Sequence, residues 1–325
     1  MTANPQRKPL MQPVDVLITA PLPPFLHEPL KQAFRCHDYV QAADKPALLR
    51  DVGRQVRGLV QGGGTVTATE LLDALPALEI ISVFGVGYDG VPTDYCKRRG
   101  IKVTNTPDVL TDDVADVAVA LILMTARGFV RANRFVHAGE WLKRGPELGT
   151  KLGGRTVGIL GLGRIGKAIA QRVQAMQMDV AYTGRKPQDV PYRYMADLEA
   201  LARASDFLIV ACPGGAATRH LVDASVLSAL GGKGTLVNIA RGSIVDEAAL
   251  VRALQAGTIK AAGLDVFEDE PNIPAPLLAM DNVVLLPHVG SATRETRQAM
   301  ADLCKQNLDR WFTEHAGLTL VPELQ

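Results

Sequence analysis

Three polar side chains each follow an apolar run, and their types suit proton transfer to a carbonyl group. They are Arg241, Glu270 and His288. Histidine titrates near neutral pH and can donate a proton to a carbonyl oxygen that becomes an alkoxide. A glutamate on the other imidazole nitrogen fixes the tautomer, and a guanidinium binds a carboxylate in a bidentate way. Singly, such residues are more often structural or surface groups. Placed together after strands of one sheet, they predict chemistry on a 2-keto acid, with His288 as the acid/base.

A glycine-rich turn lies between an apolar run and a helical pattern. Thr156–Leu160 predicts a strand and Lys167–Ala175 a helix, with Gly161, Gly163 and Gly166 between them. In this dinucleotide-binding fingerprint the first glycine permits the turn, the second lets the backbone approach a diphosphate, and the third allows close helix packing. The alternative is a tight turn without a ligand. The residues expected to bind the cofactor here are Gly161, Leu162, Gly163, Arg164, Ile165 and Gly166.

The end of the next predicted strand indicates which dinucleotide binds. Sites for NAD usually carry Asp or Glu there, on the ribose hydroxyls. Here no carboxylate lies between Asp179 and Asp189, and the strand ends with Thr183, Arg185 and Lys186. These residues suit a 2′-phosphate. We therefore predict a preference for NADPH, with NADH still usable; the alternative is a solvated basic loop.

Apolar runs alternate with helical patterns on both sides of the glycine loop, which predicts an α/β protein with parallel sheets covered on both faces. Thr111–His137 reads as one long helix between two domains. Ala292–Phe312 reads as a final helix that returns to the first domain. The predicted strands are Val14–Ala20, Arg57–Gln61, Glu79–Phe84, Ile101–Thr104, Thr156–Leu160, Asp179–Thr183, Asp206–Ala211, Gly234–Ile239, Ala261–Val266 and Val283–Leu286.

Composition argues against several partner classes. The 325 residues carry a net charge of +1 and 5% aromatic residues, which disfavours a nucleic-acid partner. No apolar run is long enough to span a bilayer, so no membrane partner is expected. Met1–Pro13 is polar and lacks the apolar core of a secretory signal, so it reads as a loose arm. The four cysteines are scattered without metal-site spacing, so we expect no metal and a cytoplasmic protein.

Several motifs together resemble one family, the D-isomer-specific 2-hydroxyacid dehydrogenases, and most closely its glyoxylate/hydroxypyruvate reductases. The resemblance covers the chain from about Val14 to the C-terminus. The motifs are Val83–Asp89, Gly158–Gly166, Asn238–Gly242, Gly263–Phe267 with Glu270-Pro271, and Leu286–Thr293.

The resemblance implies two Rossmann-like or flavodoxin-like doubly wound parallel-sheet domains, with the active site in the cleft between them. Residues 1–107 and 291–325 would form the substrate-binding domain, and residues 108–290 the NAD(P)-binding domain. It further implies a homodimer that acts on a small 2-keto or 2-hydroxy acid. Trp141 either reaches the neighbouring subunit's active site or simply packs, and the sequence favours neither.

The resemblance also implies a role for each motif residue. His288 would be the proton donor, Glu270 its support, and Arg241 a substrate ligand. The backbone amides of Val86 and Gly87 would hold the substrate carboxylate. Asp265 would contact the nicotinamide amide, and the cofactor would also be lined by Pro213, Ile239 and Gly290.

Two alternatives remain at this point. The substrate could be a bulkier 2-keto acid, such as 2-ketogluconate or an aryl pyruvate. The chain could instead be a cofactor-sensing, corepressor-like binding protein, because such proteins can keep the same three polar residues. Turnover of any 2-keto acid separates the second alternative from an enzyme.

Overall fold

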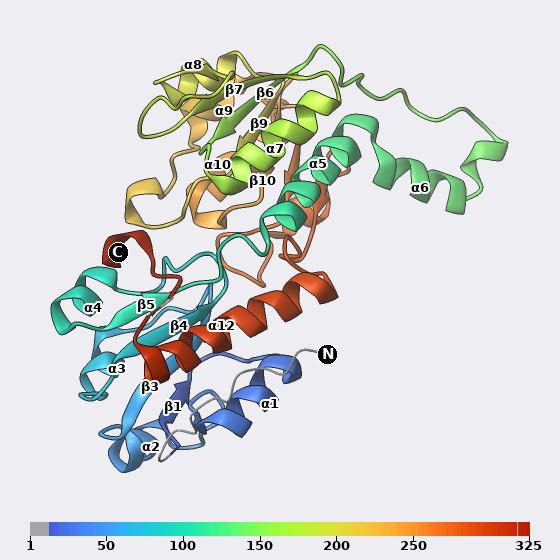
Figure 1. The fold of residues 1–325 in the computed structure, drawn as a ribbon. Coiled ribbons are helices and arrows are strands. Elements are labelled where there is room, and N and C mark those ends of the chain that lie inside the picture. Colours follow the sequence, from blue (N-terminus) through green and yellow to red (C-terminus); the bar gives the residue numbers. More distant parts are fainter. Residues whose placement is uncertain (1–12, 317) are drawn as a thin grey trace, which may run out of the picture. The chain divides into compact units, whose positions relative to one another are not determined.

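The computed structural model describes residues 13–316 and 318–325, and they form two compact units (Figure 1). The split unit comprises the described residues up to Leu110 together with those from Thr293 onward; the central unit is Thr111–Ala292. The expected boundaries, after residues 107 and 290, lie slightly earlier than these. The chain passes into the central unit where a helix begins at Thr111, and Thr293 is the N-cap of the last helix. The predicted N-terminal arm, apart from Pro13, lies outside the described residues.

The split unit holds a five-stranded parallel sheet in the order β2-β1-β3-β4-β5. This is the doubly wound, flavodoxin-like order. The last helix, α12 (Arg294–Glu314), packs on β4 and α1, as expected for a segment that returns to the first domain. The other elements are β1 (Asp15–Ile18), α1 (Pro24–Ala33), β2 (Arg35–Asp38), α2 (Lys45–Val52), β3 (Val56–Gly62), α3 (Thr69–Asp73), β4 (Ile80–Phe84), α4 (Thr93–Arg99), β5 (Lys102–Thr104) and the 3₁₀ turn η4 (Pro322–Leu324).

The central unit holds a seven-stranded parallel sheet in the order β12-β11-β10-β9-β6-β7-β8. Its strand order reverses between β6 and β9, which is where open α/β sheets bind ligands. Its strands are β6 (Thr156–Leu160), β7 (Asp179–Thr183), β8 (Arg193–Tyr194), β9 (Phe207–Val210), β10 (Thr235–Asn238), β11 (Ala261–Leu264) and β12 (Val283–Leu285). Its helices are α5 (Thr111–Arg127), α6 (Phe129–His137), α7 (Arg164–Ala175), α8 (Leu198–Arg203), α9 (Ala224–Leu230), α10 (Glu247–Gln255) and α11 (Ala275–Leu278), with 3₁₀ turns η1 (Glu140–Leu142), η2 (Ala216–Thr218) and η3 (Gly242–Ile244).

Continuous burial along the strands agrees with sheets covered on both faces. Every residue of β1, β4, β9, β10 and β11 is buried. The predicted α/β class is therefore confirmed, with two separate cores. No helix among the described residues is long and apolar enough to cross a membrane.

The long helix predicted over 111–137 is wrong: the segment forms two helices. α5 ends at Arg127 and α6 begins at Phe129, because Gly128 between them has the left-handed backbone angle φ of 61°. Such an angle interrupts a right-handed helix, and glycine adopts it with little strain.

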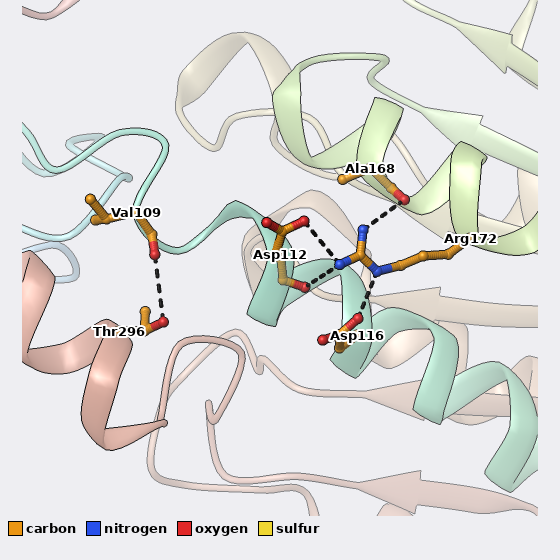
Figure 2. Close-up of polar contacts among 6 residues, drawn as sticks. All are labelled: Val109, Asp112, Asp116, Ala168, Arg172 and Thr296. Atoms are coloured by element: carbon orange, nitrogen blue, oxygen red, sulfur yellow. Dashed lines mark hydrogen bonds and ion pairs between the residues drawn. The ribbon is translucent and has the colours of Figure 1, made fainter.

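The chain passes between the units twice, and at each passage the helix that begins there is bonded to another residue of the unit it belongs to (Figure 2). Arg172 on α7 donates to Asp116 at 2.6 Å and to Asp112 at 2.9 Å, and so ties the start of α5 to the glycine-loop helix. Thr296, in the first turn of α12, donates its hydroxyl to the Val109 carbonyl at 3.5 Å. The two contacts hold the helices that begin at the crossings.

Candidate active site

The three predicted polar residues follow neighbouring strands of the central sheet. Arg241 comes after β10, Glu270 after β11 and His288 after β12. His288 Nδ1 lies 2.7 Å from Glu270 Oε2, and the other carboxylate oxygen, Oε1, accepts the Phe267 amide at 3.1 Å. The His288 amide donates to the Asp265 carbonyl at 2.9 Å, and its φ of 53° is left-handed. The imidazole is therefore held through Nδ1, which leaves Nε2 for a ligand.

The environment keeps Glu270 ionised. Partial burial raises the pKa of its carboxyl, but the hydrogen bond and charge of His288, the Phe267 amide and the charge of Arg241 together lower the pKa below its usual value. A negative Glu270 stabilises a positively charged imidazole and fixes its orientation. The effect of Arg241 also indicates that the guanidinium lies near this pair.

Arg241 is held by a local network that the sequence analysis did not predict. Asn238, 1% exposed at the end of β10, donates Nδ2 to the Arg241 carbonyl at 2.9 Å and accepts the Ala240 amide at 3.1 Å. Arg241 Nη1 donates to the Ala240 carbonyl at 2.7 Å. An asparagine that ends a strand before a turn was the available signal, because its side chain commonly bonds to the backbone of the next residues.

Asp265 shapes the turn that carries His288. Its side chain is 1% exposed, and its two oxygens accept the amides of Val289 at 2.7 Å and Gly290 at 2.8 Å. Burial raises the pKa of this carboxyl, and the two amides oppose that rise. A Cβ on Gly290 would lie 3.1 Å from Asp265 Oδ2, so a small residue suits this position.

The glycine loop is tightly packed at two of its three glycines and open at the third. Gly161 has φ of 100°, and a Cβ there would lie 2.6 Å from the Cys212 amide nitrogen. A Cβ on Gly166 would lie 2.3 Å from the Gly161 carbonyl oxygen, whereas a Cβ on Gly163 would meet open space. Gly163 is the N-cap of α7 and no side chain caps that end. The first turn of α7, with Arg164 and Ile165, thus presents amides and the positive end of the helix dipole to an anion.

The basic segment after β7 is open to solvent. Thr183 is buried and accepts the Gly161 amide with its carbonyl at 3.0 Å. Arg185 and Lys186 are exposed, and neither forms a hydrogen bond or ion pair with a described residue. Gln188 donates Nε2 to the Leu162 carbonyl at 2.9 Å and so supports the glycine loop. That support lacked a sequence signal, because the partners lie 26 residues apart.

The remaining predicted residues also follow strands. Ile239 is buried after β10, and Pro213 is exposed after β9. Val86 and Gly87 follow β4 in the split unit, and neither amide donates to a described residue. Sequence reasoning missed Glu268, which accepts Arg219 at 2.7 Å and lies 2.9 Å from His220 Nε2.

These Glu268 contacts join the loop after β9 to the loop that carries Glu270. The described residues include no cluster of His, Cys, Asp or Glu able to hold a metal ion.

Comparisons with known proteins give the family. The family model for the D-isomer specific 2-hydroxyacid dehydrogenase, NAD binding domain, matches residues 119–290. Glyoxylate/hydroxypyruvate reductase A from Arabidopsis thaliana is 45% identical, over 96% of this chain and 100% of the relative. A 2-ketogluconate reductase from Gluconobacter oxydans is 45% identical, over 94% and 98%.

A solved structure adds a three-dimensional match. The NADPH-dependent glyoxylate/hydroxypyruvate reductase from Sinorhizobium meliloti, in complex with NADP and malonate, is 47% identical with a TM-score of 0.91, over 96% of this chain and 98% of that one. The strand orders, the glycine loop and these identities agree. The chain belongs to the D-isomer specific 2-hydroxyacid dehydrogenases, oxidoreductases that use a nicotinamide cofactor.

Proposed function

We propose that the protein reduces a small 2-keto acid, glyoxylate or hydroxypyruvate, to the D-2-hydroxy acid with NADPH. The observation that carries the proposal is the contact between His288 Nδ1 and Glu270 Oε2 at 2.7 Å. These two residues and Arg241 follow three neighbouring strands, β12, β11 and β10. The names of the Arabidopsis and Sinorhizobium relatives support the substrate class.

His288 is the proposed catalytic acid. Glu270 accepts a hydrogen bond from Nδ1–H and compensates the charge of the imidazolium, so that Nε2 carries the proton for the substrate. As the carbonyl carbon gains a hydride, its oxygen gains negative charge, and His288 transfers the Nε2 proton to that oxygen. The product is a neutral hydroxyl group, and His288 must regain a proton from solvent before the next turnover.

The substrate carboxylate needs donors that fix its orientation. We assign it to the Arg241 guanidinium and to the backbone amides of Val86 and Gly87. An arginine presents several N–H donors in one plane and can bind a carboxylate in a bidentate way. On this assignment the split unit supplies backbone donors, and the central unit supplies the Arg241 guanidinium and the cofactor residues.

We assign the dinucleotide to the glycine loop and the start of α7, with Asp265 at the nicotinamide amide. Pro213, Ile239 and Gly290 are the other proposed cofactor contacts. When bound, the reduced nicotinamide supplies the hydride. Thr183, Arg185 and Lys186 are the proposed contacts of a 2′-phosphate. Two exposed cations follow β7 without a partner among the described residues, and no carboxylate lies between Asp179 and Asp189. The NADP complex of the Sinorhizobium relative is consistent with this preference.

We further propose that the protein is a homodimer that pairs through the segment Phe129–Leu148. This segment projects away from the sheet of the central unit (Figure 1). It exposes large apolar side chains, with Trp141 68% and Leu142 93% exposed. A second copy of the chain would cover them. Sedimentation should give a dimer for the wild type and a monomer for Leu142→Asp. A monomeric wild type would refute the pairing.

The four cysteines are free thiols, which supports a reducing compartment such as the cytoplasm.

The test of the main proposal is a screen of 2-keto acids. Glyoxylate, hydroxypyruvate, 2-ketogluconate and an aryl pyruvate are compared with NADPH and NADH through the nicotinamide absorbance. We expect the highest kcat/KM for a small acid with NADPH. A higher value for 2-ketogluconate would favour the bulkier class, which the Gluconobacter relative supports. Absence of turnover with every acid would favour a cofactor-sensing binding protein.

A further inference from the structure

The turn Gly85–Gly87 of the split unit is held by its carbonyl groups. The Thr106 amide donates to the Gly85 carbonyl at 2.9 Å, and Asn105 Nδ2 donates to the Val86 carbonyl at 2.8 Å. Both peptide groups are trans. In a trans peptide the C=O and the following N–H point in opposite directions. The amides of Val86 and Gly87 are therefore turned away from the segment Asn105–Thr106.

Asn105 is itself fixed by the C-terminal segment. Its carbonyl accepts the Thr319 hydroxyl at 2.5 Å, and its amide donates to the Thr319 carbonyl at 3.2 Å. Thr319 in turn bonds to Asn307 on α12: Asn307 Nδ2 donates to Oγ1 at 2.9 Å, and the Thr319 amide donates to Asn307 Oδ1 at 3.0 Å. Asn307 is 1% exposed and Asn105 7%. Side chains that make several hydrogen bonds at once are held in a fixed orientation.

Two further contacts keep the same segment in place. The Val321 amide donates to the Val103 carbonyl of β5 at 3.0 Å, next to an antiparallel bridge between Thr104 and Leu320. On the other side of the turn, the Tyr88 hydroxyl donates to Glu323 at 3.0 Å. Strand β5, which precedes Asn105, and Tyr88, which follows the turn, are thus both bonded to the C-terminal segment.

We propose that Asn105, with Thr319 and Asn307 behind it, is a positioning residue that aims the Val86 and Gly87 amides at the substrate carboxylate. The proposal rests on the function proposed above. Donors aimed in advance bind an anion without the cost of reorienting the backbone. Thr319 and Asn307 act through Asn105 rather than on the substrate, so their effect should appear in substrate affinity and not in the chemical step.

The test uses Asn105→Asp, which keeps the shape of the side chain but replaces its donor with an oxygen, and Thr319→Val, which removes the hydroxyl. Matched controls are Asn282→Asp, whose Nδ2 bonds to the Lys260 carbonyl in the central unit, and Thr313→Val, whose hydroxyl bonds within α12. Steady-state kinetics with glyoxylate and inhibition by oxalate measure carboxylate binding. Fluorescence titration measures NADPH affinity.

For Asn105→Asp we expect the glyoxylate KM and the oxalate inhibition constant to rise about tenfold, with kcat and NADPH affinity within about twofold, because one charge-assisted hydrogen bond is weakened. Thr319→Val should show the same split with a smaller rise, and the controls should match the wild type. An unchanged KM in Asn105→Asp would overturn the proposal. A parallel loss of kcat and NADPH affinity would also overturn it, since that pattern indicates general structural damage.

A second measurement does not depend on turnover. Oxalate should slow hydrogen exchange at Val86 and Gly87 in the wild type and much less in Asn105→Asp. Equal protection in both proteins would refute the positioning role, even if the wild type is an active reductase. An inactive wild type that still shows the difference would instead refute the proposed reaction and leave the positioning role standing.

Discussion

The two regions assigned to the substrate are built in opposite ways. The His288 region is a side-chain pair whose partners lie 18 residues apart, with its turn held by Asp265. The Gly85–Gly87 turn presents backbone amides, and the contacts behind it join residues 214 positions apart. A role that needs a particular side chain can be predicted from the residue type and its position in the sequence. The orientation of a backbone amide depends on distant partners and can hardly be predicted in this way.

The largest effect should come from removing the imidazole. His288→Asn should lower kcat by about 100- to 10,000-fold, because general acid catalysis is lost. NADPH affinity should be unchanged, since the glycine loop is untouched. Stopped-flow turnover and fluorescence titration measure the two quantities, with His315→Asn as the control at a second left-handed histidine. If His288→Asn kept wild-type kcat, the proton donor would have to be sought elsewhere.

The support of the imidazole should matter next. Glu270→Gln should lower kcat by about 10- to 100-fold, because a charged hydrogen bond contributes about 1.5–3 kcal/mol. The Glu270 pKa is lowered in the folded protein, so its carboxylate stabilises the fold above the ordinary pKa of a glutamate. That stability is lost as the pH falls through the lowered value.

Thermal unfolding across acidic pH checks the sign. The Tm advantage of the wild type over Glu270→Gln should be full near neutral pH and should vanish in acid. An advantage that grows as the pH falls would contradict the direction of the shift.

Cofactor choice offers a third comparison, at the exposed segment that carries Arg185 and Lys186. Arg185→Ala should lower kcat/KM for NADPH by about tenfold or more and leave that for NADH unchanged, because one charged contact to the 2′-phosphate is lost. Arg203→Ala, an exposed cation on α8, is the control. An equal loss of kcat/KM with both cofactors would show that Arg185 does not bind the 2′-phosphate.

The smallest effect on activity should come from a backbone change in the Gly85–Gly87 turn. Gly85 has φ of 155°, and a Cβ there would lie 3.0 Å from the Gly63 Cα. Gly85→Ala should therefore destabilise the turn by about 1–3 kcal/mol and raise the substrate KM several-fold with kcat largely kept. Gly100→Ala is matched, because Gly100 also has a positive φ but faces open space. A rise in KM in both variants would indicate strain without a specific role.

Much of the fold was predictable because local patterns determine it. The apolar runs that became β6, β9, β10 and β11 are buried throughout or nearly so, and the glycine loop has its chemistry in consecutive residues. The strand β2 was missed, since its sequence Arg-Cys-His-Asp is polar and it pairs only with β1. The break at Gly128 was missed because a lone glycine inside a helical pattern is often tolerated.

The sequence predicted that His288, Glu270 and Arg241 follow strands of one sheet, and they do, but it did not predict the groups that hold them. Asn238 bonds to the residues just after it, and its place at a strand end was a usable signal; nothing in the neighbourhood of Gln188 distinguishes it from a surface amide. The role of Asn105 could be seen only when Thr319 had been placed beside it. These residues gain their roles from the tertiary structure.

The left-handed backbone of His288 has an evolutionary consequence. Only glycine, asparagine, aspartate and histidine adopt such angles readily, so the residues that replace it with least strain have no imidazole. On the catalytic role proposed for His288, such a replacement would abolish turnover and leave the fold and the glycine loop intact. A reductase of this architecture is thus one substitution away from a pseudoenzyme that still binds its nucleotide.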